Sequence, residues 1–129
     1  MYKVMESLSF SRNEMAAIIY WAAKMAAVDD HVDDSEIDMI TSTMRRFGIS
    51  SSEAKSMFIM AETMDPTDAV RIVSLMPYAK KRFVAAYLGT QIAIDYHIDD
   101  KEMALWALVS SICNLPTMSI KEAIDYMAD

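Results

Sequence analysis

Apolar residues recur at intervals of three and four positions along most of the chain, which is the spacing of amphipathic helices. The first such segment predicts a helix from Ser11, which has the spacing of a capping box with Glu14, to about Val28. Only two glycines and three prolines occur, and alternating β-branched segments are absent. The sequence therefore predicts an all-α fold of about seven helices. The six later helices are expected over about residues 33–47, 50–64, 66–76, 77–94, 99–113 and 119–128.

Residues that start and stop helices support these limits. Gly48 follows the second predicted helix as a C-terminal cap. Pro66 lies in the first turn of the fourth, directly after its cap Asp65. Two more capping boxes, SSSE and SIKE, open the third and the seventh. The predicted helix 77–94 is apolar on several sides, which is typical of a helix at the centre of a core.

Two acidic segments of the chain are nearly the same. Residues 26–37 read AAVDDHVDDSEI and residues 92–103 read IAIDYHIDDKEM, at a spacing of 66. This similarity indicates an internal duplication within one domain, 1–129, with repeats at about 11–64 and 78–128 bridged by a helix over 66–76. Because a single three-helix unit would bury too little apolar surface, we expect the copies to pack about a pseudo-twofold axis. The identical pairs are Asp29 and Asp95, His31 and His97, Asp33 and Asp99, Asp34 and Asp100, and Glu36 and Glu102.

The repeated acids have two interpretations. Asp33 with Glu36, and Asp99 with Glu102, are spaced as capping boxes, and a helix dipole favours acids in the first turn. In contrast, Asp29 and its mate Asp95 lie at the C-terminal ends of predicted helices, where the dipole disfavours negative charge. The acids are therefore either caps and solvated surface, or part of a cation site.

A cation site in these segments would not be an EF-hand. Counted from Asp29, position 6 is Asp34 instead of glycine, and position 12 is Ile40 instead of glutamate. A non-standard site for Ca²⁺ or Mg²⁺ would take oxygen ligands, and His31 and His97 extend the choice to Mn²⁺ or Zn²⁺. The candidate metal ligands are Asp29, Asp33 and Glu36 in the first copy and Asp95, Asp99 and Glu102 in the second.

The duplicated helix-loop-helix pattern resembles the TerB-like family, named for a bacterial tellurite-resistance protein. The matching positions are Asp29, Val32 and Glu36 in the first copy, and Asp95, Ile98 and Glu102 in the second. The resemblance covers about residues 11–128. It implies a compact fold of seven to eight helices, an association with tellurite and other chemical stress, and a metal-binding role for the acids. The resemblance does not imply an established enzymatic activity. The family commonly has glycine after the motif Asp, where this chain has Asp30 and Tyr96.

Composition narrows the class of protein. A net charge of -7 opposes binding to nucleic acid, and the longest apolar run, broken by Lys24, is too short to span a membrane. A single cysteine, Cys113, and no signal peptide in residues 1–11 predict a cytoplasmic protein with a buried, inert thiol. We find no motif for a catalytic nucleophile or a phosphate loop. The expected function is a non-catalytic, stress-associated domain that binds a divalent cation, with a plain protein–protein interaction module as the alternative; the oligomeric state is open.

Three other features have expected places. Trp21 and Trp106 fall on the predicted packing positions and are expected in the core. The basic run Lys80, Lys81 and Arg82 opens a predicted helix against its dipole. This run is either a solvated face or a surface that meets the acidic loops or an anionic partner.

Overall fold

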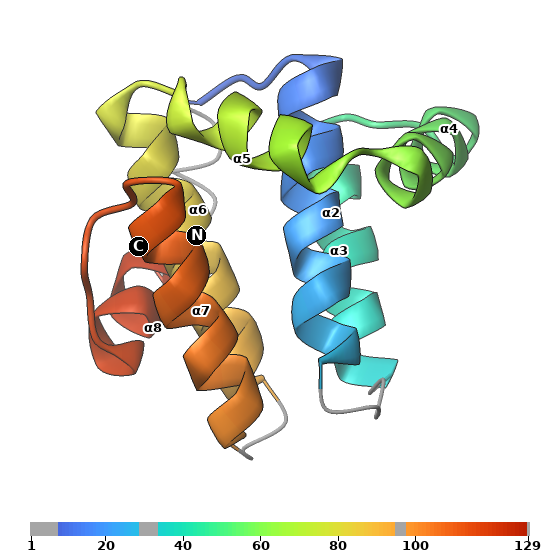
Figure 1. Cartoon of the computed structure of the whole chain (residues 1–129). Helices are drawn as coiled ribbons and strands as arrows, with labels where there is room; N and C mark the ends of the chain where they lie inside the picture. Colours follow the sequence, from blue (N-terminus) through green and yellow to red (C-terminus); the bar gives the residue numbers. More distant parts are fainter. Residues whose placement is uncertain (1–7, 29–33, 95–97, 129) are drawn as a thin grey trace.

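The computed structural model describes residues 8–28, 34–94 and 98–128, and of residues 34–37 it describes the backbone alone. The described residues are helical without a strand and form a single compact domain, as the sequence predicts (Figure 1). The seven helices are α2 (Arg12–Ala27), α3 (Asp34–Arg46), α4 (Ser51–Thr63), α5 (Pro66–Ser74), α6 (Tyr78–Ala93), α7 (Asp100–Ile112) and α8 (Ile120–Ala128).

The limits of the helices show the duplication directly. α2 and α3 begin and end 66 residues before α6 and α7. The connection between α7 and α8, residues 113–119, is longer than the connection 47–50 between α3 and α4. The second copy is therefore longer in this connection, which contains Pro116. Figure 1 shows the pairs α2/α3 and α6/α7 standing beside each other, with α5 across one end.

Both second helices of the copies end in the same way. Gly48 after α3 and Asn114 after α7 have φ angles of 78° and 56°, in the left-handed region. The amide that follows each of them donates to the carbonyl five residues back, at 3.1 Å in the first copy and 2.8 Å in the second. This is the pattern of a Schellman cap, in which Gly is favoured and Asn is tolerated.

The central pair of the core is α2 and α6. Residues 15–22 of α2 and residues 83–89 of α6 are all buried, so neither helix has a solvated side over these turns. The central place predicted for the helix 77–94 is thus confirmed. None of the helices that the structure describes is both long and apolar enough to cross a membrane.

Buried polar side chains link the helices by donating to backbone carbonyls. Trp21 Nε1 donates to Ala69 O of α5 at 3.4 Å, and Trp106 Nε1 donates to Ala85 O of α6 at 3.0 Å. Both indoles are nearly buried, as expected, and each satisfies its N–H group. The tryptophans therefore fix the approach of α5 to α2 and of α7 to α6.

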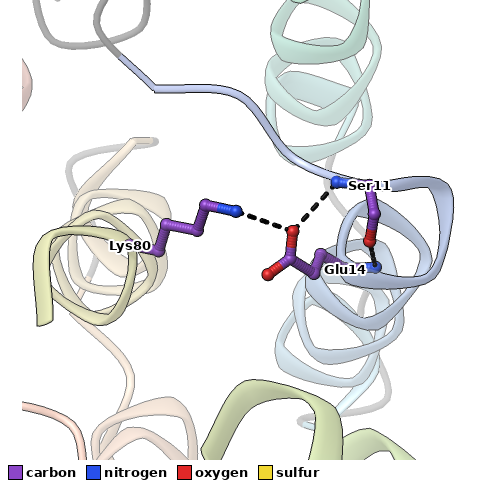
Figure 2. Close-up of polar contacts among 3 residues, drawn as sticks. All are labelled: Ser11, Glu14 and Lys80. Atoms are coloured by element: carbon purple, nitrogen blue, oxygen red, sulfur yellow. Dashed lines mark hydrogen bonds and ion pairs between the residues drawn. The ribbon is translucent and has the colours of Figure 1, made fainter. Parts of the chain in front are cut away.

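Equivalent positions of α2 and α6 form an ion pair with each other. Glu14 and Lys80 are 66 residues apart, and Lys80 Nζ donates to Glu14 Oε1 at 2.8 Å (Figure 2). The same oxygen accepts from the Ser11 amide at 2.9 Å, which completes the predicted capping box. In a twofold arrangement, only residues close to the axis can meet their own mates. A contact between equivalent positions is therefore what a pseudo-twofold axis between α2 and α6 predicts.

Two residues of the basic run at the start of α6, Lys80 and Arg82, contact other residues of the same chain. Lys80 also lies over the ring of Phe10, 5.3 Å from its centroid, and Arg82 lies 4.9 Å from the ring centroid of Tyr126 in α8. The carboxylate that Lys80 meets is Glu14, which belongs to neither acidic loop. Attraction to Glu14 compensates for the unfavourable place of Lys80 at a helix N-terminus.

The Glu14–Lys80 pair should make stability depend on pH. Partial burial raises the pKa of Glu14, but the hydrogen bonds from Lys80 and Ser11 and the charge of Lys80 outweigh it, so the pKa lies below 4.5. A lowered native pKa gives stability that is present above the unfolded pKa and is lost as pH falls through the native one. Glu14→Gln should cost about 1 kcal/mol at neutral pH and flatten the urea-unfolding profile below about pH 5.

The matched control for this prediction is the exposed pair of Lys121 and Asp125, which has the same distance of 2.8 Å. Lys121→Met should leave the unfolding curve nearly unchanged, because solvent screens an exposed pair. Equal losses for Glu14→Gln and Lys121→Met would contradict a special role for the pair at the axis.

Gly89 of α6 is expected to resist replacement. A Cβ atom there would lie 2.6 Å from Trp106 Cζ2 and 2.9 Å from Ala123 Cβ. Gly89→Ala should therefore cost about 1–3 kcal/mol by overpacking. Helix propensity alone predicts the opposite, a gain of up to about 1 kcal/mol. Urea unfolding decides between the two, and a more stable Gly89→Ala variant would contradict the close packing of α6, α7 and α8.

Candidate functional site

The helix ends that flank the two acidic segments belong to the same end of the domain. Figure 1 shows the C-terminal ends of α2 and α6 and the N-terminal ends of α3 and α7 at one end, opposite α5. The pseudo-twofold packing produces this placement, because equivalent helix ends related by an axis along the pairs point the same way. The described helix ends that flank the two acidic segments therefore lie at one end of the fold.

The structure describes part of the predicted cation site. Asp29, Asp33 and Asp95, together with His31 and His97, lie outside the described residues. Glu36 lies in the first turn of α3, and its side chain is not described. Among the side chains that are described, no group of three or more His, Cys, Asp or Glu is placed to hold a metal ion. The role of these residues as ligands stays a prediction.

Asp99 is the N-cap of α7. Its Oδ1 atom accepts from the Lys101 amide at 2.8 Å and from the Glu102 amide at 3.1 Å. This confirms the expected cap in the second copy. Because both bonds use the same carboxylate oxygen, capping is compatible with a cation bound at the other oxygen, Oδ2.

Glu102 is a buried acid. It follows the cap by three positions in α7 and is 4% exposed. The glutamates at the same position of α4 and α8, Glu53 and Glu122, are exposed. Capping alone therefore does not require the burial of Glu102. A buried carboxylate is stable in a fold only if it is protonated, hydrogen-bonded or bound to a cation.

Two polar residues in the last turns of α6 have buried side-chain atoms. Gln91 is fully buried, and its Nε2 atom donates to Ala22 O of α2 at 2.7 Å. Gln91 Oε1 and Thr90 Oγ1 have no hydrogen-bond partner among the described residues. Sequence reasoning missed Gln91, although one signal was available: its equivalent in the first copy is the buried Met25. Polar groups thus approach the acidic end from inside the core.

Two hollows of the described surface lie away from Asp99 and Glu102. A groove of about 570 Å³ lies between α7 and the connection to α8, and a hollow of about 440 Å³ lies between α2 and α4. Neither is lined by Asp99 or Glu102. Tyr20 and Lys24 line the second hollow, with Lys24 Nζ 5.3 Å from the Tyr20 ring centroid. These two hollows therefore do not coincide with the described part of the acidic site.

Comparison with known proteins gives a relative whose function is unknown. No model of a protein family matches the chain, and no curated protein matches it. A solved structure, a protein of unknown function from Porphyromonas gingivalis W83, is 37% identical to it, with a TM-score of 0.82. The match covers 95% of this chain and 92% of that chain.

The chain belongs to the same family as this Porphyromonas gingivalis protein. The relative extends the helical fold to a second protein of nearly the same length. Because its function is unknown, the likeness brings no activity to this chain, and the TerB-like resemblance stays a prediction.

The chemistry of Cys113 can be tested directly. Cys113 is fully buried, as predicted, and burial raises the pKa of its thiol to about 11, with Lys81 and Ser74 opposing this rise. Since the thiolate is the reactive form, the native thiol should react with a disulfide reagent at pH 8 at least about 100-fold more slowly than the urea-unfolded chain. Comparable rates in the two states would contradict this burial and would reopen a role for Cys113 as a nucleophile.

Proposed function

We propose that this chain is a non-catalytic, TerB-like domain of a bacterial stress system that binds a divalent cation at its acidic helix-loop-helix segments. The observation that carries the proposal is the burial of the Glu102 carboxylate in the first turn of α7, at the end of the fold where the helices that flank both acidic segments end or begin. The tellurite and stress association comes from the family resemblance alone.

The argument from Glu102 is one of electrostatic cost. Removing a carboxylate from water is unfavourable, and a charged neighbour of opposite sign is the strongest compensation. In α7 the nearest residues along the chain to Glu102 supply one exposed cation, Lys101, and two further acids, Asp99 and Asp100. A divalent cation would offset this excess of negative charge.

The donor set fits a hard cation. Asp99 and Glu102 offer carboxylate oxygens, and Asp95 is the third proposed ligand of the second copy; Asp29, Asp33 and Glu36 would form the equivalent site in the first. Ca²⁺ and Mg²⁺ prefer such oxygen ligands. The histidines of the two segments, His31 and His97, would extend the range to Mn²⁺ or Zn²⁺.

A plain interaction module is the second candidate function. The supporting observation is the outer face of α7, where Leu108 and Ile112 are exposed to solvent at 56% and 45%. Exposed apolar residues on a helix are a common feature of protein contacts. The cation experiment separates the candidates, because an interaction module has no ion-specific response.

The test is thermal unfolding in Ca²⁺ or Mg²⁺ against NaCl at matched ionic strength. With a dissociation constant of about 0.1 to 1 mM, about 10 mM ion should stabilise the domain by roughly 1.4 to 2.7 kcal/mol per site. This corresponds to a rise in Tm on the order of 5 °C. Glu102→Gln should abolish most of the ion-specific rise for the second copy, and without ion it should cost little, because Gln can return the same capping hydrogen bond.

Glu122→Gln is the matched control, since Glu122 has the same place in a capping box but is exposed. It should keep the full ion-specific rise. The cation proposal is wrong if NaCl reproduces the whole effect, or if Glu102→Gln keeps it. In either case the acids are caps and solvated surface.

A further inference from the structure

The outer face of α7 differs in character from the equivalent face of α3. In α7 it consists of Ala104, Leu108 and Ile112, which are all exposed. The two helices occupy equivalent places in the duplication, so α3 shows which residues the fold accepts at these outer positions. The positions of α3 that lie 66 residues earlier are Asp38, Ser42 and Arg46. The second copy therefore has an apolar surface that the fold itself does not require. We call Leu108 and Ile112 the α7 ridge.

A groove lies directly beside this ridge. Its volume is about 570 Å³, and it runs between α7 and the longer connection 113–119, with Trp106 and Met118 among its lining residues. Ala107 and Ser111 also line the groove, and each precedes a ridge residue by one position. Successive residues of a helix are about 100° apart, so ridge and groove occupy neighbouring faces of α7. We call this hollow the α7 groove.

The segment that forms both features has no charge. Residues 103–120 contain no Asp, Glu, Lys or Arg, in a chain of which 24% is charged and whose net charge is -7. A basic partner would gain nothing from this face and would be drawn to the acidic end instead. Two copies of the chain repel each other over most of their surfaces, and they meet with least repulsion at an uncharged face. The charge pattern therefore favours a partner with an equally uncharged face, which a second copy provides.

We propose that α7 is the interface of a homodimer, in which two copies pair through antiparallel α7 helices. A ridge and a groove on neighbouring faces of one helix are self-complementary under a twofold axis, since each ridge can enter the groove of the other copy. The last turn of α7 has no basic residue, and Lys101 lies in its first turn. Antiparallel pairing brings Lys101 of each copy to the C-terminal end of the other α7, where the helix dipole favours a cation.

The interface is small. A helix of this length is about 20 Å long, so the pair buries less than the roughly 1,200 Å² that stable complexes need. The dimer should therefore be weak, with a Kd above about 1 µM, and concentration-dependent. Because the contact is uncharged while each copy is acidic, added NaCl should tighten association by screening the repulsion between the copies.

Sedimentation equilibrium between about 5 and 500 µM tests this proposal, with EDTA present so that a cation cannot bridge the acidic ends. The parent should shift from monomer to dimer over this range, and Leu108→Glu should weaken dimerisation at least 10-fold. Since Leu108 is already 56% exposed, the variant should keep its fold, which its unfolding curve checks. Ser42→Glu, at the equivalent position of α3, is the matched control and should dimerise as the parent does.

Amide shifts on dilution locate the interface without any substitution. They should be confined to residues 101–118, and the exposed residues Ala23 and Lys24 of α2 serve as the reference surface. A chain that stays monomeric at 500 µM, a dimer that survives Leu108→Glu, or shifts centred away from α7 would each overturn the proposal. So would a monomer that uses the α7 ridge to bind a different protein.

Discussion

The burial of α2 against α6 is the constraint on which the rest of the structure depends. Residues 15–22 and 83–89 leave no solvated side, so each helix needs the other to remove its apolar surface from water. Neither copy of the repeat can do this alone, and the two copies therefore share one core. Equivalent positions meet at Glu14 and Lys80, as a pseudo-twofold axis requires, and the helix ends that flank both acidic segments lie at the same end. The place of the candidate cation site thus follows from the packing of α2 against α6.

The two copies differ at positions where identical residues would destabilise the fold, and also at outer positions that the core does not constrain. Two identical charges at positions 14 and 80 would repel across the axis, whereas Glu14 and Lys80 attract. Gly89 admits Trp106 and Ala123 to close contact with α6, while its equivalent in α2, Ala23, is exposed. The outer faces of α3 and α7, which the core does not constrain, have become polar in one copy and apolar in the other. The first kind of difference stabilises the fold, and the second leaves a surface for another molecule.

Much of the fold could be predicted from the sequence because its signals are local. Capping boxes at Ser11 and Ser50, Pro66 after its cap, and Gly48 in a left-handed conformation determine where helices begin and end without reference to distant residues. The candidate site could not be predicted in the same way, because it depends on tertiary packing, which local sequence patterns do not contain. The spacing of Asp99 and Glu102 predicts a cap, and Asp99 is one, but the burial of Glu102 follows from how α7 packs. The partner of Lys80 is likewise set by the axis, and no sequence motif indicates it.

α7 belongs to both proposals, and its geometry keeps them separate. The inner side of its first turn carries Glu102, whereas the α7 ridge lies on the outer side of its middle and last turns. Salt favours both sites, but it relieves repulsion within one copy at the first and between two copies at the second. Screening reproduces part of any stabilisation by a cation, because both relieve repulsion among acids within one copy. The same screening strengthens contact between two acidic copies at an uncharged face. Ion-specific stabilisation and self-association therefore respond to different variables, and one of them can fail without the other.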